Sequence, residues 1–255
     1  MNGNISIERL WWLLRADFAS GYRALVTVSA TLAGIILIAS LISLESAAAA
    51  QVFFLSWYGG MLYVWGSIAS SRAFAELHDK SRNQAYLLIP ASAIEKTVAR
   101  LLAVTVGLSV YLLVFTTVVA LLVAGVHRLF PGGGHGLFNP LDERLWPIIT
   151  GYLFVQSFFF LGAAWFRRRH FIKTALVVTL AAIGFGLFVL LTLRVVFAPE
   201  DFADLGNAIA RAVESYRNLL RLFESVTDIL AVTLPVACWI IAWLRVREAQ
   251  VSDGI

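Results

Sequence analysis

The sequence predicts an all-α polytopic membrane protein with six transmembrane helices, forming a single transmembrane domain over residues 1–255. Of the 255 residues, 60% are hydrophobic and only 14% are charged, whereas roughly a quarter of the residues in a soluble domain are charged. Five uncharged runs are long enough to cross about 30 Å of hydrocarbon and a sixth is slightly shorter, whereas ten-residue alternating segments typical of a β-barrel are absent. This composition argues against a soluble enzyme, a disordered chain and a nucleic-acid-binding domain.

The six uncharged runs are 16 to 26 residues long and together cover about half of the chain. They are Ala24–Leu44, Ser46–Ser71, Leu101–Val126, Leu145–Phe166, Thr174–Leu193 and Ile229–Leu244. Because the sixth run is short, its helix is expected to begin near Val226, with Asp228 at its outer end.

The distribution of Lys and Arg predicts the orientation, because cytoplasmic loops carry an excess of both. Fourteen of the 20 Lys and Arg residues flank the spans on one side, including the tract Arg167–Lys173 in a short loop. The other six are Arg128, Arg144, Arg194, Arg211, Arg217 and Arg221. Both termini are therefore expected in the cytoplasm. The excess of Arg over Lys, 17 to 3, suggests a GC-rich bacterium, so the expected location is the bacterial cytoplasmic (inner) membrane.

An interfacial helix is expected over residues 5–23, before the first span. Ile7, Leu10, Leu14 and Phe18 recur at helical spacing, and charged residues occupy the other face. The adjacent pair Trp11 and Trp12 is typical of a helix lying in the membrane interface. The alternative is that this segment simply extends the first span.

The cytoplasmic segment at residues 72–99 contains two distinct signals. Pro90 ends any helix before it, and Ser92 with Glu95 forms an S-x-x-E capping box that starts a helix continuing into span three. Before Pro90, the run 86–89 is Tyr-Leu-Leu-Ile, which a cytosolic loop does not normally expose. It is expected either to pack on the membrane face or to dock on a partner.

The extracytoplasmic segment at residues 199–225 has an amphipathic helical pattern, as one helix or as two with a break near Gly206. Its apolar face is expected to comprise Phe202, Leu205, Ile209, Tyr216 and Phe223. That face needs cover from the outer interface, from the spans or from a second copy of the chain.

A search for catalytic motifs finds no phosphate-binding G-x-x-x-x-G-K-[ST], no H-E-x-x-H and no G-x-S-x-G. His127 and His135 lie near each other in sequence, but two histidines without further ligands are more typical of a solvated loop than of a metal site. We therefore expect no catalytic residue, cofactor or metal in this chain.

The polar side chains within the spans are uncharged and are expected to bond neighbouring helices rather than a substrate. They are Gln156, Thr116, Thr117, Ser109 and Thr192. The lack of an ionisable group near the middle of a span argues against coupling to protons or sodium.

The cytoplasmic segment resembles the loop after span two in permeases of ATP-binding cassette exporters of the drug, polysaccharide and antibiotic type. The resemblance rests on Glu76, on the run Tyr86–Ser92, on Glu95 with Lys96, and on Arg100 with Leu101. The chain departs from that family at Asn83-Gln84-Ala85, where the family often has Gly-Thr before the leucines.

The resemblance implies that two permease copies, or a copy and a paralogue, form a dimer, and that each docks an ATPase subunit through this loop. ATP and Mg would be bound by the ATPase. The docking residues implied are Glu76, Lys80, Arg82, Asn83, Gln84, Tyr86, Leu87 and Leu88. In this interpretation Ser92 and Glu95 cap a helix and do not contact the ATPase.

The leading functional hypothesis is thus the permease subunit of an ATP-driven exporter, which forms the substrate pathway. One alternative is a membrane anchor or regulatory subunit of an ATPase complex that transports nothing. Another is a polytopic lipid-processing enzyme, which would require clustered His, Asp or Glu at one membrane face, and the sequence lacks such a cluster.

Overall fold

The computed structural model describes residues 6–43, 46–78, 91–128, 137–166, 169–196 and 217–252. These residues form helices joined by turns, with no strand among them, so the predicted all-α class is confirmed. The elements are α1 (Ile7–Ser43), α2 (Ala47–Ser71), α3 (Ala75–His78), α5 (Ala93–Leu102), the π-helical turn η1 (Ala103–Gly107), α6 (Leu108–His127), α7 (Leu145–Trp165), α8 (His170–Val196) and α10 (Arg217–Ser252).

Five stretches of these helices are long and apolar enough to cross a membrane. They are Ala48–Leu77, Ala93–His127, Leu145–Trp165, His170–Thr192 and Asp228–Ala249. The first predicted span corresponds to a shorter apolar stretch, Val26–Ser40, within α1. Among the described residues, five of the six predicted spans therefore meet the criteria of length and composition.

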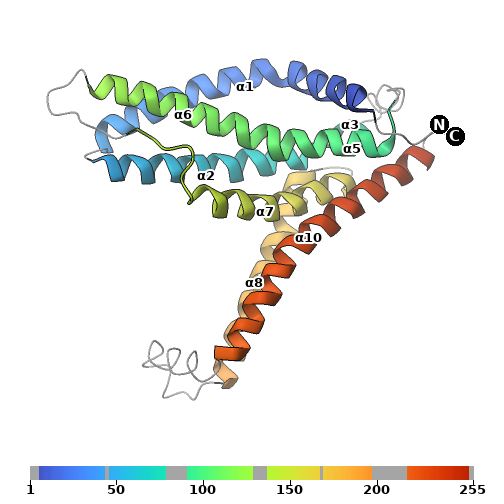
Figure 1. Ribbon diagram of the computed structural model, residues 1–255. Coiled ribbons are helices and arrows are strands. Elements are labelled where there is room, and N and C mark those ends of the chain that lie inside the picture. Colours follow the sequence, from blue (N-terminus) through green and yellow to red (C-terminus); the bar gives the residue numbers. More distant parts are fainter. Residues whose placement is uncertain are drawn as a thin grey trace.

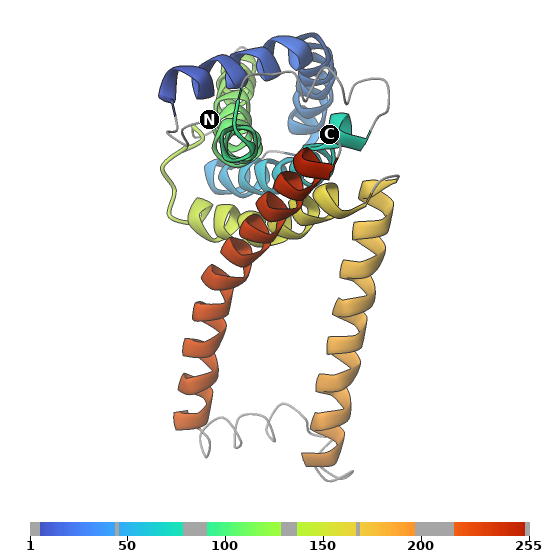
Figure 2. The same ribbon diagram turned by 90° about the vertical axis from the view of Figure 1, so that its right-hand side faces the viewer.

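Two predicted helix continuations can be compared with the structure. α5, η1 and α6 follow one another without interruption, so the helix that starts after Ser92 does continue into span three, as predicted. α1 is likewise unbroken, because no proline separates the predicted interfacial helix from span one. Figure 2 shows the first part of α1 from the side and the later part foreshortened, so its direction changes along its length.

The helix that carries the last span begins earlier than predicted, although its apolar stretch does begin at Asp228, as expected. α10 begins at Arg217, nine residues before Val226, and continues to Ser252 with Pro235 inside it. The sequence prediction relied on hydropathy, which falls at Asp228, but a helix ends only where its backbone pattern is interrupted. Part of the predicted extracytoplasmic segment therefore belongs to the same helix as the last span.

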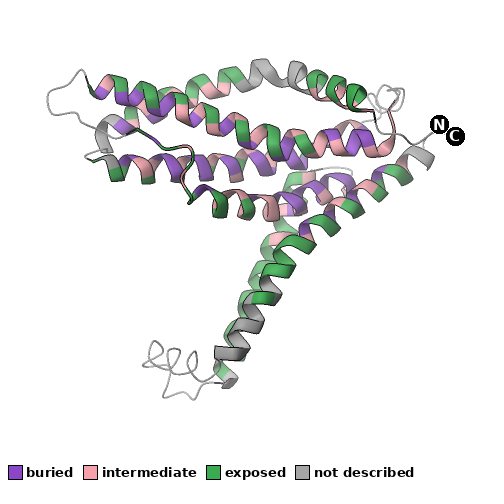
Figure 3. Ribbon diagram, viewed as in Figure 1, coloured by how far each residue is buried: buried purple, intermediate pink, exposed green. Residues whose placement is uncertain are grey.

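The helices fall into two groups. α1, α2, α6 and α7 lie side by side with similar axes, whereas α8 and the first part of α10 extend away from them at a steep angle (Figures 1 and 2). Figure 3 shows that the buried residues concentrate in the first group, and that α8 is largely exposed. Within His170–Thr192, Thr174 is buried, while apolar side chains such as Phe185 (69% exposed) and Phe188 (66%) are not.

The core of the first group depends on two reciprocal contacts between α2 and α7. Tyr152 of α7 packs on Gly66 of α2, and Tyr63 of α2 packs on Gly151 of α7. A Cβ atom at either glycine would collide with the facing tyrosine ring. The two rings also meet edge to face, with centroids 6.3 Å apart. Glycine is required here because it lets two apolar helices approach closely enough to bury Tyr152 fully and Tyr63 in part.

A second cluster lies where α2 ends, under the short helix α3. Phe74 and Phe160 are both fully buried, and their rings meet edge to face with centroids 4.9 Å apart. Ala242 and Val246 of α10 complete this cluster, together with Leu77. It joins the α2–α3 turn to α7 and α10.

The π-helical turn lies opposite Tyr152. The Tyr152 hydroxyl donates a hydrogen bond of 2.6 Å to the carbonyl of Val104, within η1. A π turn leaves backbone carbonyls poorly paired inside the helix, and this fully buried tyrosine satisfies one of them from a neighbouring helix.

Most polar side chains predicted to link the spans do not do so. Ser109, Thr117 and Thr192 each donate to a carbonyl one turn earlier in their own helix. A hydroxyl so close to its own backbone satisfies itself locally before it can reach a neighbour. Gln156 does bond across helices, since its Oε1 accepts a hydrogen bond of 3.3 Å from Trp239 Nε1 of α10.

Candidate functional site

The candidate site lies at one end of the first helix group. There the N-terminal end of α1, α3, the start of α5 and the C-terminal end of α10 lie close together (Figures 1 and 2). These elements flank residues 79–90, which the sequence predicts to dock on a partner. The described residues thus define the base from which that segment extends.

The side of the base that precedes the segment is firmly packed. α3 follows α2 after a three-residue turn, and backbone hydrogen bonds such as that from Ala75 N–H to the Arg72 carbonyl close this turn. Phe74 and Leu77 are buried against α7 and α10. α3 is therefore packed into one unit with α2, α7 and α10.

The side that follows the segment begins with the predicted capping box, which is present. Ser92 Oγ accepts a hydrogen bond from the Glu95 N–H, and Glu95 Oε2 accepts one of 2.8 Å from the Ser92 N–H. Two backbone N–H groups that the helix leaves unpaired are thereby satisfied, which places the first residue of α5 at Ala93.

Glu95 has a second set of partners that the sequence did not reveal. Its Oε1 accepts a hydrogen bond of 2.9 Å from the backbone N–H of Ser6 and lies 3.2 Å from a guanidinium nitrogen of Arg9. The Glu95 side chain is only 1% exposed, whereas that of Arg9 is 44% exposed. The same carboxylate therefore caps α5 and fastens the beginning of α1 to it.

An ion pair joins the two sides of the base. Arg100 Nη2 of α5 donates to Glu76 Oε2 of α3 at 2.8 Å. Glu76 precedes residues 79–90 in the chain and Arg100 follows them, so this contact holds together the two helices, α3 and α5, that flank those residues. Glu76, which the resemblance assigned to docking, thus also braces the loop.

The remaining predicted docking residues lie outside the described residues. They are Lys80, Arg82, Asn83, Gln84, Tyr86, Leu87 and Leu88. On the predicted extracytoplasmic face, Phe202, Leu205, Ile209 and Tyr216 also lie outside, while Phe223 falls within α10. These assignments stay predictions.

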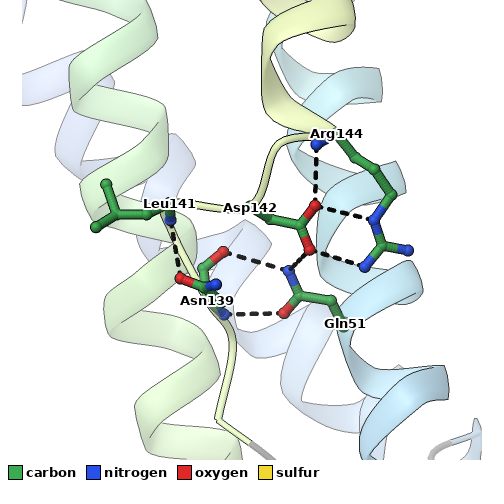
Figure 4. A network of polar contacts seen from close by, with 5 residues as sticks. All are labelled: Gln51, Asn139, Leu141, Asp142 and Arg144. Atoms are coloured by element: carbon green, nitrogen blue, oxygen red, sulfur yellow. Dashed lines mark hydrogen bonds and ion pairs between the residues drawn. The ribbon is translucent and has the colours of Figure 1, made fainter.

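A polar network at the far end of α2 was not anticipated (Figure 4). Gln51 donates to Asp142 Oδ2 at 3.0 Å, donates to the Asn139 carbonyl at 3.2 Å, and accepts from the Asn139 N–H at 2.9 Å. Both carboxylate oxygens of Asp142 also accept hydrogen bonds from Arg144. The loop before α7 is thereby fixed to the start of α2.

Hydrogen bonds from Arg144 hold the pKa of Asp142 well below the usual range for a carboxyl group. The same contact raises the pKa of Arg144. A sequence signal for this network did exist, because Asn139-Pro140 is a turn-forming pair, and the Asn139 side chain does accept a hydrogen bond from the Leu141 N–H. Its partner Gln51 lies 91 residues from Asp142 and was not predictable.

The polar side chains described at the two ends of the helix group pair with one another and with backbone groups. Within the described residues, no group of three or more His, Cys, Asp or Glu side chains lies close enough together to hold a metal ion. The contacts found at these two ends hold segments of the chain together. Comparison of the chain with protein-family models, curated proteins and solved structures gives no match.

Proposed function

We propose that this chain is the permease subunit of an ATP-driven exporter, and that residues 79–90 dock on a separate ATPase subunit that binds ATP and Mg. The observation that carries this proposal is the ion pair between Glu76 and Arg100, which ties together the two ends of that segment. A loop closed at its base transmits a displacement to the helices on which it stands, whereas an open loop would absorb it.

The packing around the base supports a role in transmission. On one side, Phe74 joins the loop to α7 and α10. On the other side, Glu95 joins it to α1, and α5 continues through η1 into α6. A displacement of residues 79–90 by the ATPase would therefore reach five helices, and ATP binding would shift the populations of two arrangements of the permease.

The topology we propose has six spans, with Val26–Ser40 as the apolar part of the first, in a bacterial cytoplasmic membrane. Both termini would be cytoplasmic. The position of the N-terminal end of α1 and the C-terminal end of α10 beside α3 and α5 supports placing all four on one side (Figure 1). The part of residues 5–23 within α1 would lie in the inner interface, and residues 199–225 would lie outside.

We further propose that the permease is a dimer with a second copy or a paralogue. α8 leaves the first helix group at a steep angle, so its apolar side chains have few neighbours in the single chain. A partner permease would cover apolar side chains of α8 such as Phe185 and Phe188, which are exposed in the single chain.

The docking proposal is tested by co-purification with an ATP-binding cassette ATPase encoded beside this chain. Replacing both Tyr86 and Leu87 by Asp is expected to abolish co-purification while the permease stays folded, because aromatic and apolar anchors dominate small interfaces. Ser92→Ala is the control. It should cost about 1 kcal/mol of helix stability and leave the complex intact. A double variant that retains the ATPase with unchanged affinity would refute the docking role.

Transport then separates the exporter from its alternatives. The purified complex in sealed vesicles should move substrate when ATP is added, and the Tyr86→Asp, Leu87→Asp variant should not. A complex that forms and hydrolyses ATP but transports no hydrophobic solute would instead support the regulatory subunit. Turnover of lipid by the chain without any ATPase would support the enzyme.

A further inference from the structure

A pocket of about 140 Å³ lies between α1, α2 and α6. α1 contributes Ser29 and Leu32 to its wall, and α2 contributes Trp65 and Ala69. The pocket exists because α1 packs mainly on α5 and α6 and stands away from α2 at this level. The side chains of Leu32 and Trp65 are partly exposed, so the pocket is open to the surroundings of the helices.

The longest part of the pocket wall belongs to α6. On α6 it is lined by Leu108, Leu112 and Phe115, which recur every three to four residues and so share one face of the helix. The seven steps from Leu108 to Phe115 correspond to about 10 Å along α6, at 1.5 Å per residue. The lining residues all lie within Val26–Ser40, Ala48–Leu77 and Ala93–His127, the apolar stretches of their helices.

The wall offers almost no polar group to a ligand. Its two hydroxyl groups belong to Ser29 and Tyr111, and a hydrogen bond of 2.5 Å joins their oxygens. A cation, a phosphate or a group of waters entering the pocket would lose its hydration without gaining a partner. Hydrocarbon, in contrast, would lose nothing by leaving the surrounding lipid and would gain close contacts with the wall.

From this geometry we propose that the pocket binds one acyl chain of a bilayer phospholipid, lying parallel to α6 between α1 and α2. Three observations select this occupant: the lining residues all lie in the apolar stretches of their helices, the wall on α6 extends over about 10 Å along that helix, and the wall is apolar. The proposal does not depend on the transport function.

Leu112 provides a direct test because it lines the pocket and is only 6% exposed. The full chain is reconstituted in nanodiscs of phosphatidylcholine that carries a photoreactive diazirine within one acyl chain. After illumination, mass spectrometry should find label on Leu112 as well as on Val110 and Val114, which are 53% and 57% exposed. Label confined to the exposed valines would mean that lipid contacts only the outer surface, and the proposal would fail.

Two tryptophan variants on α1 separate a chain in the pocket from lipid elsewhere. Leu32→Trp should fill the pocket and reduce labelling of Leu112 several-fold while labelling of Val114 stays unchanged. Ile35→Trp is the matched control, because Ile35 is 50% exposed on the same helix and does not line the pocket. Equal labelling of Leu112 in both variants would overturn the proposal. If Leu32→Trp does not fold, the smaller change Leu32→Phe is tested in the same way.

Two further outcomes would also decide the question. If the pocket residues of the unmodified protein cross-link to a second copy of the chain and not to lipid, the pocket is a protein interface. If an excess of benzene, but not of unlabelled phosphatidylcholine, abolishes the label, the pocket prefers compact solutes. Either result would contradict the acyl-chain assignment.

Discussion

The carboxylate of Glu95 accepts a hydrogen bond from the backbone N–H of Ser6 across 2.9 Å, although 89 residues separate the two in the chain. Glu95 is nearly fully buried and also caps its own helix. One side chain therefore determines both where α5 begins and where the first turn of α1 is held. The same residue lies five positions after Pro90, at the end of the segment proposed to dock on the ATPase.

We expect Glu95→Ala to release the start of α1 as well as to weaken the cap of α5. Removing a buried acceptor leaves the N–H groups of Ser6 and Ser92 unpaired, which costs about 1–3 kcal/mol per group. Thermal unfolding should show the loss, and amide hydrogen exchange should rise in the first turn of α1. Glu8→Ala, an exposed change in that turn, is the control and should alter neither measurement.

A double-mutant cycle of Arg9→Ala with Glu95→Gln should isolate the ion pair within this joint. Because Arg9 is 44% exposed, solvent screens the charge, and the coupling free energy should be below about 1 kcal/mol. A coupling of several kcal/mol would show that the charge of Arg9, and not the backbone of Ser6, holds α1 in place.

Gly66→Ala and Gly151→Ala should each destabilise the contact between α2 and α7. The added methyl group would collide with Tyr152 in the first case and with Tyr63 in the second. Overpacking of this kind should lower the free energy of unfolding by about 1–3 kcal/mol. Gly60→Ala on α2 is the matched control, because nothing lies within 4 Å of its added Cβ. Denaturation in detergent should find Gly60→Ala neutral or stabilising, and equal effects at all three glycines would contradict the packing argument.

The network around Asp142 should make the loop before α7 sensitive to acid. The pKa of Asp142 in the folded protein lies below the ordinary value. The contact of Asp142 with Arg144 therefore contributes stability above about pH 4, where Asp is ionised even in the unfolded chain. This contribution should be lost as the pH falls through the folded-state pKa. Asp142→Asn should remove that part of the acid dependence in thermal unfolding, and an unchanged pH profile would argue against the network.

Cysteine labelling checks which sides the two ends of the helix group face. Cys238, the only native cysteine, is buried, so it should react little. Leu141 lies in the loop before α7 and is 87% exposed. The variant Leu141→Cys should therefore react with a membrane-impermeant maleimide added outside intact cells. Glu248→Cys, near the end of α10, should react only after the membrane is opened. The opposite pattern would reverse the proposed topology.

The helical elements were largely predictable because they depend on local properties of the chain. Hydrophobic runs of sufficient length predicted α2, α6, α7 and α8, and Ser92 with Glu95 predicted the start of α5. The exact starts of α1 and α10 were less predictable. Hydropathy changes at the membrane surface, whereas a helix without an internal break continues past that surface.

By itself, then, the sequence determined that this protein is a helical chain rich enough in apolar runs for a membrane, and it determined where one helix is capped. Only the tertiary structure decided which distant residues meet: Ser6 with Glu95, Glu76 with Arg100, and Gln51 with Asp142. It also decided that α1 stands away from α2 to leave a pocket, and that glycines on α2 and α7 face tyrosines. The reason is physical. Helix formation follows from neighbours in sequence, whereas these contacts depend on how side chains of particular size fit between helices whose relative positions no local pattern specifies.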